Sequence, residues 1–327
     1  MSLKNIILIG LTFICTRFCY GQASEVINYH VHVFSNALIT NIENQGQKLT
    51  DDVYEVTCQH GECSEIKKIK AHNGDKLVLI SGPYAFKEDY QLKDSVALIS
   101  LVQYENDLLK DLVNTDRKNL YGFCGINPNW DFALSETKRC IEDLEMDGIK
   151  LHFQCNKINI NDSLTHSKIS EILKYLSNKD RPVLIHLNGT DLYEGQHIAQ
   201  DFIKNFLNNA DEQTIIFAHS GGPGGLTSFN IEVLKEFDHF FKTNKYNRNK
   251  KIYFELSGAI LKTDYPEKLE PAALKDMIIK IGSEHFLFGS DYPFQTGERY
   301  LKVLEEDLGL NPITLRKIKT NNIFMKK

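Results

Sequence analysis

Short apolar runs rich in β-branched and aromatic residues alternate along the chain with longer segments whose apolar residues recur every three or four positions. The short runs predict buried strands and the longer segments predict amphipathic helices. Strands are predicted at residues 27–33, 77–81, 121–126, 148–153, 182–187, 214–219, 251–257 and 285–290. Helices are predicted at residues 95–114, 133–146, 167–176, 195–208, 231–242 and 271–281. Repeated strand–helix units form a parallel sheet, which eight strands close into a barrel.

The spacing of the predicted strand ends supports one continuous barrel. His152, His186, His219, Ser257 and Asp291 follow one another at intervals of 33 to 38 residues, with no accompanying sequence repeat. The stretch after the first strand is longer and polar, and no linker divides the chain. We therefore predict an α/β fold, a single (β/α)8 TIM-like barrel over residues 22–327 with a polar insertion after strand 1.

The first 21 residues are typical of a signal peptide. Lys4 precedes an apolar run over residues 6–15, and small residues follow around Gly21. The run is too short for a transmembrane helix, which needs about 20 residues. We expect a secreted or periplasmic mature chain without an integral membrane segment. A buried N-terminal strand or helix is the alternative.

Composition and charge narrow the function classes. The chain has 327 residues, 42% of them hydrophobic and 25% charged, which is typical of a globular protein. The formal net charge of −5 becomes more negative when Lys4 and Arg17 are removed with the signal peptide, and it disfavours binding to nucleic acid. We expect a small-molecule substrate as the partner, and homo-oligomerisation stays open.

Two of the cysteines, Cys58 and Cys63, lie close together in the polar insertion. They would close a small disulfide loop in an oxidising compartment. A zinc knuckle is the less favoured alternative, because no second cysteine pair with zinc-ligand spacing follows.

The first predicted strand carries a pair of histidines, His30 and His32. Residues two apart in a strand face the same side, so both imidazoles would enter one cavity. Imidazole pairs suit zinc and neighbouring divalent metals. A structural role explains such a pair equally well when it stands alone.

Later strands end in groups of matching chemistry: Lys150 and His152, then His186, His219 and Asp291. Parallel barrel enzymes place their chemistry at the C-terminal ends of strands, where distant residues converge. Each residue alone has a structural explanation, a hydrogen-bonded histidine or a turn-forming aspartate. Their occurrence in strand order favours a common site.

These motifs resemble the amidohydrolase superfamily, and within it the amidohydrolase-related metal-dependent hydrolases with a TIM-barrel fold. The resemblance extends from about residue 26 to the C-terminus. It rests on Asn-Tyr-His-Val-His-Val-Phe, Gly-Ile-Lys-Leu-His, Val-Leu-Ile-His-Leu-Asn-Gly, Ile-Ile-Phe-Ala-His-Ser-Gly-Gly and Phe-Leu-Phe-Gly-Ser-Asp-Tyr-Pro. It implies one or two divalent ions, zinc foremost. The implied metal-site residues are His30, His32, His186, His219 and Asp291, with Asp291 also the base that deprotonates water.

Two positions qualify the resemblance. Asn28 stands where many relatives have aspartate, a change that affects how the histidine pair is oriented. Lys150 matches a lysine that some superfamily members carboxylate to bridge two metals, so it is also a candidate ligand. A plain Lys150 would instead need a carboxylate partner such as Glu255. His152, nearer the barrel mouth, is expected to contact substrate.

The resemblance implies a metal-dependent hydrolase that cleaves an amide, ester or lactone in a small organic molecule with activated water. We take Asp291, His219 and His152 as its candidate catalytic residues. The first alternative is a metal-dependent non-oxidative decarboxylase of an aromatic or unsaturated acid, since relatives with nearly the same ligands release carbon dioxide. The second alternative is a catalytically inactive barrel that binds a ligand, which would be favoured if Asp291 or His186 turned away from the histidine pair.

Overall fold

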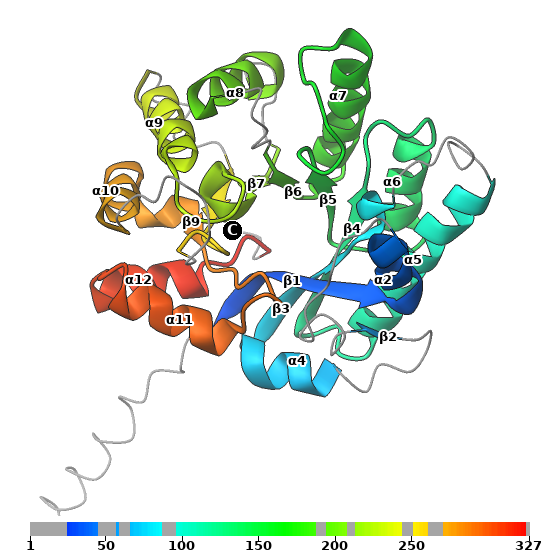
Figure 1. Cartoon of the computed structure of the whole chain (residues 1–327), viewed down its shortest axis with the longest axis horizontal. Coiled ribbons are helices and arrows are strands. Elements are labelled where there is room, and N and C mark those ends of the chain that lie inside the picture. The colour runs from blue at the N-terminus through cyan, green and yellow to red at the C-terminus, as the bar shows by residue number, and fades with distance from the viewer. Residues whose placement is uncertain are drawn as a thin grey trace, which may run out of the picture.

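Eight parallel strands form the centre of the molecule in a computed structural model that describes residues 25–44, 57–58, 66–86, 96–187, 194–207, 213–243, 251–260 and 271–324. The strands are β1 (Ile27–Ser35), β3 (Lys76–Ser81), β4 (Leu120–Ile126), β5 (Gly148–His152), β6 (Val183–His186), β7 (Ile215–Phe217), β8 (Ile252–Glu255) and β9 (Phe286–Leu287). Each pairs with the next in chain order. Figure 1 shows them surrounded by helices, which confirms the predicted TIM-like barrel.

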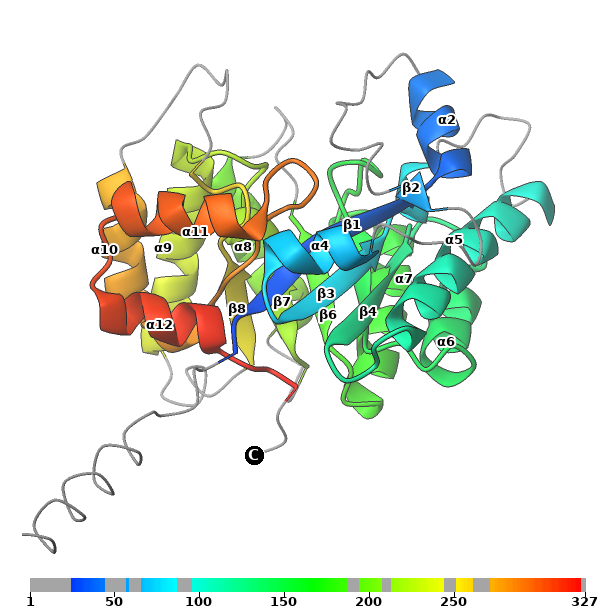
Figure 2. The ribbon, with the colours of Figure 1, turned by 90° about the horizontal axis from the view of Figure 1, so that it is seen from below.

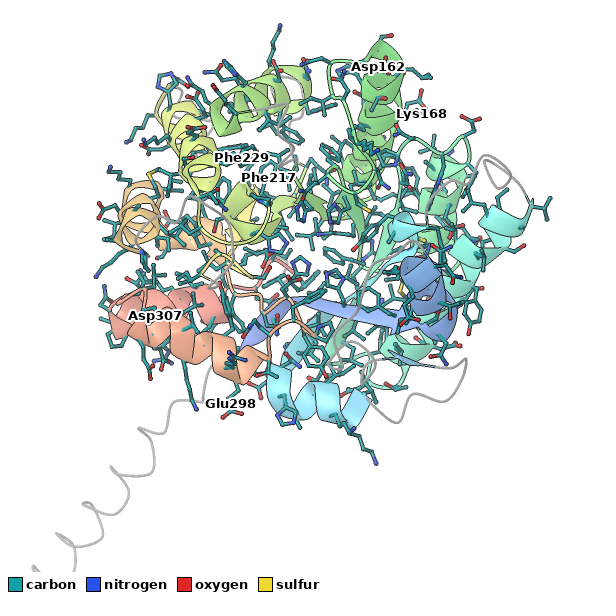
Figure 3. All side chains as sticks on the ribbon, in the orientation of Figure 1. Asp162, Lys168, Phe217, Phe229, Glu298 and Asp307 are labelled. Carbon is teal, nitrogen blue, oxygen red and sulfur yellow. The ribbon has the colours of Figure 1, made fainter. Side chains whose placement is uncertain are left out.

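The surrounding helices are α4 (Ile66–Asn73), α5 (Val96–Asn114), α6 (Ala133–Glu142), α7 (Ser163–Asn178), α8 (Gly195–Phe202), α9 (Ser228–Thr243), α10 (Pro271–Ile281), α11 (Gly297–Glu306) and α12 (Pro312–Thr320). The sequence located α5 to α10, with the predicted bounds of α10 matching the structure. It missed α4, α11 and α12, each of which has only two or three buried residues. In Figure 3, Phe217 lies between barrel and helices, whereas Asp162 and Asp307 lie on the outer rim.

A bulge in β1 determines which side chains enter the barrel. The pairing of β1 with β3 shifts between Asn28 and Val31. Before the shift, Tyr29 belongs to the apolar cluster inside the barrel. After it, Val31 belongs to the cluster that packs against the helices, so His30 and His32 face the interior. An extra residue in a strand reverses its alternation in this way.

Hydrogen bonds between β1 and the segment that follows β9 close the barrel. Tyr29 N donates to Phe288 O at 2.9 Å, Asp291 N to His30 O at 2.9 Å, and His32 N to Tyr292 O at 2.8 Å. This closure places the first histidine pair directly beside Asp291. Residues separated by most of the chain thereby become neighbours.

The predicted insertion after strand 1 begins with α2 (Asn36–Asn44), which continues β1 beyond the C-terminal end of the barrel (Figure 2). The short strand β2 (Thr57–Cys58) pairs in parallel with the end of β1. Cys63, the side chain of Cys58 and residues 1–24 lie outside the described residues, so the disulfide and the signal peptide stay predictions. Among the described residues, no helix combines the length and apolar character needed to cross a bilayer.

The C-terminal segment after α12 covers the opposite end of the barrel (Figure 2). The ring of Phe324 stacks on Tyr121 with centroids 4.0 Å apart. The hydroxyl of Tyr29 donates to Asn321 O at 2.9 Å and accepts from Ile323 N at 3.0 Å. These contacts shield the barrel interior from water at the end opposite to the C-terminal ends of the strands.

We predict that Phe324→Ala lowers the free energy of unfolding by about 1–3 kcal/mol, less than the 3–5 typical of a fully buried phenylalanine, because Phe324 is only partly buried. Urea denaturation followed by circular dichroism measures the change. Ile313→Ala, at a side chain 72% exposed, is the control and should change it by less than about 0.5 kcal/mol. Equal stability of the two variants would show that the segment is not a structural cover.

Candidate metal centre

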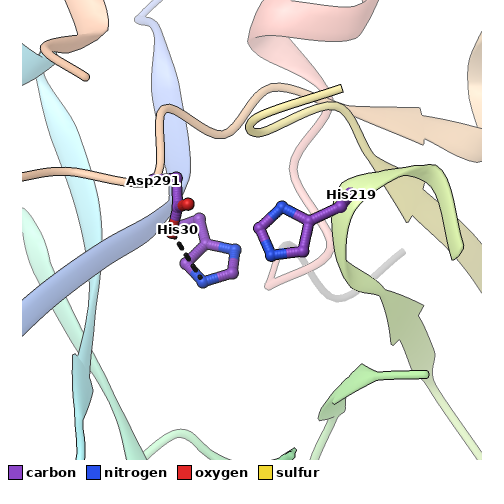
Figure 4. A group of neighbouring side chains, drawn as sticks. All are labelled: His30, His219 and Asp291. Carbon is purple, nitrogen blue, oxygen red and sulfur yellow. Dashed lines mark ion pairs between the residues drawn. The ribbon is translucent and has the colours of Figure 1, made fainter. Parts of the chain in front are cut away.

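Three side chains from three parts of the barrel meet at its C-terminal end: His30 on β1, His219 after β7 and Asp291 after β9. Each offers one ligand atom, and these atoms all lie within 4.8 Å of one another (Figure 4). His32 joins them, because its Nε2 lies 3.1 Å from Nε2 of His30 and 3.3 Å from Oδ1 of Asp291. We call these four residues the metal cluster.

The donor set of the metal cluster fits a divalent ion. Ligand atoms around an ion at about 2.0–2.2 Å are separated by about 3.0–3.5 Å. The His30–Asp291 separation of 3.5 Å, from Nε2 to Oδ1, falls in this range with the two distances above. Three imidazole nitrogens and one carboxylate oxygen are ligands that zinc and neighbouring metals accept.

Hydrogen bonds to the far nitrogens of two imidazoles direct their Nε2 atoms into the cluster. Nδ1 of His219 donates to the carbonyl oxygen of Ser257 at 2.7 Å. Nδ1 of His30 donates to Oε1 of Glu255 at 2.7 Å. A neutral imidazole that donates through Nδ1 keeps the Nε2 lone pair for a metal, so both rings have the ligand tautomer.

Glu255, at the end of β8, is fully buried and connects several of these groups. Besides the His30 ring, it accepts hydrogen bonds from His219 N at 3.0 Å, Ser257 N at 2.8 Å and Ser257 Oγ at 2.6 Å. The sequence indicated Glu255 as a partner for Lys150. The hydrogen bonds of its carboxylate are instead with His30, His219 and Ser257. Ser257 was noted only as a strand end, and no local signal revealed its role.

The backbone of His219 has a left-handed conformation, with φ of 53°. The strand β7 therefore ends at Phe217, earlier than predicted, and the chain turns so that the imidazole faces the barrel axis. Asn230 of α9 fixes this turn by donating from Nδ2 to His219 O at 2.8 Å. A Cβ on Gly222 would lie 2.1 Å from that Nδ2, so the glycine-rich stretch gives Asn230 room.

Asn28 connects β1 to the segment that carries Asp291. Its Nδ2 donates to Ser290 Oγ at 2.8 Å, and its Oδ1 accepts from Ser290 N at 3.0 Å and from His30 N at 3.2 Å. Asn28 thus acts through the backbone on both sides of the cluster. An aspartate could not donate the first of these bonds.

His186 and His152 lie next to the metal cluster but have other partners. Their rings stack with centroids 3.9 Å apart, and the His186 ring lies 4.8 Å from that of His219. Nε2 of His186 lies 2.9 Å from Oε1 of Gln154, a partner the sequence did not indicate. Nδ1 of His152 accepts a hydrogen bond from Cys155 N at 3.1 Å. Both histidines line the centre, and the assignment of His186 as a ligand stays a prediction.

Lys150, on β5, is buried inside the barrel. Its Nζ has no hydrogen-bond partner among the described residues. Burial lowers the pKa of Lys150 to about 8, against the opposing influence of Glu255 and Asp291. A larger fraction of Lys150 is therefore the neutral amine, the form that reacts with carbon dioxide, than in a solvated lysine. A carboxylated Lys150 stays a prediction.

Burial gives the site the protonation states that metal binding needs. It lowers the pKa values of His30, His32, His152 and His186, so these imidazoles are neutral at pH 7. Burial by itself would raise the pKa of Asp291, but His30, His32 and His219 lower it below its usual range. The metal cluster therefore presents the neutral imidazoles of His30 and His32 beside an ionised carboxylate.

The fold and this donor set define a metal-dependent barrel enzyme. The amidohydrolase family profile matches residues 85–322, and the chain belongs to this family. No curated protein matches the sequence.

Solved structures give the same fold at low sequence identity. A dihydroxybenzoic acid decarboxylase from Polaromonas sp., with bound manganese and the inhibitor 2-nitroresorcinol, has 16% identity and a TM-score of 0.62 over 90% of this chain and 94% of its own. A 5-carboxyvanillate decarboxylase from Sphingomonas paucimobilis has 14% identity and a TM-score of 0.60 over 91% and 97%. A 2,6-dihydroxybenzoate decarboxylase from Rhizobium has 15% identity and a TM-score of 0.62 over 90% and 95%.

We predict that the metal-free protein loses stability as pH falls below about 6.5. The histidines then bind protons in the unfolded chain but stay neutral in the folded protein, where they are buried. His30, His32, His152 and His186 have pKa values lowered by folding, and each contributes up to about 1.4 kcal/mol per pH unit. Denaturation midpoints between pH 5 and 8 measure the slope, which His152→Gln should reduce. A free energy of unfolding that does not change from pH 7 to 5 would contradict the neutral assignments.

We also predict that Glu255→Gln weakens metal binding about 10- to 100-fold, because an amide cannot accept all four hydrogen bonds and His30 loses its orientation. Competition with a fluorescent zinc chelator measures the affinity. Glu105→Gln, at another buried carboxyl group that accepts hydrogen bonds from Ser35 and from none of the described residues of the metal cluster, is the matched control. An unchanged affinity in Glu255→Gln would exclude the orienting role.

Proposed function

We propose that this protein is a metal-dependent, non-oxidative decarboxylase of an aromatic or unsaturated carboxylic acid. The observation that carries the proposal is the metal cluster of His30, His32, His219 and Asp291 at the C-terminal mouth of the barrel. The similar solved structures that bear names of aromatic-acid decarboxylases support this reaction over hydrolysis.

Decarboxylation breaks the bond between the substrate carbon and its carboxylate, releases carbon dioxide and requires a proton on the carbon left behind. A bound divalent ion, zinc or the manganese of the Polaromonas structure, would supply a Lewis acid that holds and polarises the acid. Asp291 is ionised, so it would first accept a proton from water and then pass that proton to the carbon. Its Oδ1, 3.3 and 3.5 Å from Nε2 of His32 and His30, places it at the centre where the acid would bind. His219 adds a third imidazole to the site.

Hydrolysis of an amide, ester or lactone is the second candidate. The observation in its favour is the lowered pKa of Asp291, which keeps the carboxylate ionised and able to accept a proton from water. The inactive-barrel alternative expected Asp291 or His186 to turn away from the histidine pair. The Asp291 carboxylate faces the pair, and Nε2 of His186 lies 2.9 Å from Oε1 of Gln154. Parallel screening of carboxylic acids for carbon dioxide release, and of esters, lactones and amides for cleavage, separates the two reactions.

We predict that Asp291→Asn keeps the fold and loses about 10²–10⁴-fold in turnover, because an amide cannot carry the proton. His30→Ala should instead lower metal content first, with activity falling in proportion. Carbon dioxide release and elemental analysis of both variants, compared with wild type, provide the measurements. Wild-type turnover in fully metallated Asp291→Asn would move the proton transfer to another group, with His152 the next candidate.

A further inference from the structure

A pocket of about 340 Å³ opens at the C-terminal ends of β3, β4 and β5. Aromatic and polar side chains line it. The lining includes Tyr84, Phe86, Asn127, Cys155, Asn156 and Lys157. The reactions considered above assign no role to this pocket.

Tyr84 and Cys155 connect the pocket wall to the metal centre. The ring of Tyr84 lies 5.2 Å from the ring of His152. The backbone N of Cys155 donates to Nδ1 of the same histidine at 3.1 Å. His152 in turn stacks on His186, whose ring lies 4.8 Å from that of His219. A chain of adjacent rings therefore leads from the pocket to the metal cluster.

Two polar side chains of the pocket, Asn156 and Lys157, could each bind a polar group of a ligand. Asn156 donates from Nδ2 to Tyr84 O at 2.8 Å, but its buried Oδ1 has no partner among the described residues. A buried acceptor left without a donor is costly, so a hydroxyl group from a ligand would satisfy it. Lys157 is an exposed side chain of the pocket lining, and it forms no ion pair with any carboxylate that the structure describes.

We propose that this pocket is a substrate subsite that binds an arm carrying both a carboxylate and a hydroxyl group. Lys157 would attract the carboxylate, Asn156 Oδ1 would accept from the hydroxyl, and Tyr84 would border the path toward the reacting end. The arm carries one carboxylate, and the substrate needs a second one that reacts at the metal cluster. For that second carboxylate, the inference rests on the proposed function. The substrate class is therefore an aromatic dicarboxylic acid with a hydroxylated side arm.

The single tryptophan of the chain gives a direct reporter for this subsite. Trp130 is 1% exposed, and its backbone N donates to the carbonyl oxygen of Asn127, one of the pocket residues, at 3.2 Å. Binding in the pocket should change the fluorescence of Trp130. Occupancy can thus be measured without turnover.

The test titrates the metal-loaded full chain with two probes, 4-carboxyphenyllactate, which has the arm, and 4-propylbenzoate, which lacks its polar groups. We expect the first to bind more tightly to wild type. Lys157→Met should reduce its affinity about three- to tenfold and leave that of 4-propylbenzoate unchanged, whereas Lys157→Arg should restore the preference. Lys174→Met, which removes an exposed lysine from α7 away from the pocket, is the matched control.

The outcomes separate the subsite from the proposed function. If both probes bind wild type equally, or if Lys157→Met keeps the preference, the subsite is wrong, even when carbon dioxide is released. If the preference depends on Lys157 but neither the probes nor the screened carboxylic acids release carbon dioxide, the subsite stands and the proposed function fails. Where the arm-bearing probe is turned over, Lys157→Met should raise KM about three- to tenfold at unchanged kcat, as expected for a group that binds without taking part in the reaction.

Discussion

The metal centre depends on the buried carboxylate of Glu255. A buried charge is tolerated only when it is paired or fully hydrogen-bonded, and Glu255 accepts from four donors at 2.6–3.0 Å. Those donors belong to β1, to the turn after β7 and to the segment after β8. Satisfying one carboxylate therefore fixes the relative positions of His30 and His219, the two imidazoles of the metal cluster that lie furthest apart in sequence. Stability and metal geometry are set by the same contacts.

The bulge in β1 is the second constraint, and it explains how one strand serves two layers of the barrel. Tyr29 packs inside the barrel near the C-terminal segment, while His30, the next residue, also faces the interior. Strict alternation would send one of the two outward. Because of the extra residue, β1 fills the barrel interior with the ring of Tyr29 and then supplies His30 and His32 nearer the C-terminal end.

Much of this architecture could be predicted from sequence because it depends on local periodicity. The eight strands and the helices α5 to α10 follow from runs and repeats within single segments. The approach of His30, His219 and Asp291 follows from the rule that parallel strands end on one face. The sequence did not reveal the hydrogen-bond partners of the histidines. Ser257 lies 227 positions from His30, and Gln154 lies 32 positions from His186. Such partners are set by strand register and by bulges, which leave no local pattern.

The charges of the interior bear on the choice of substrate. Asp291 and Glu255 place two carboxylates in the centre, and Lys150, with its pKa of about 8, supplies one ammonium group near pH 7. These fixed charges favour a dication, and a bound dication reverses the sign of the local field. A centre of positive field at the C-terminal mouth of the barrel attracts carboxylates in preference to neutral amides or esters, because charges interact strongly where water is excluded. The same field would favour release of neutral carbon dioxide, since the product leaves without a charge to hold it.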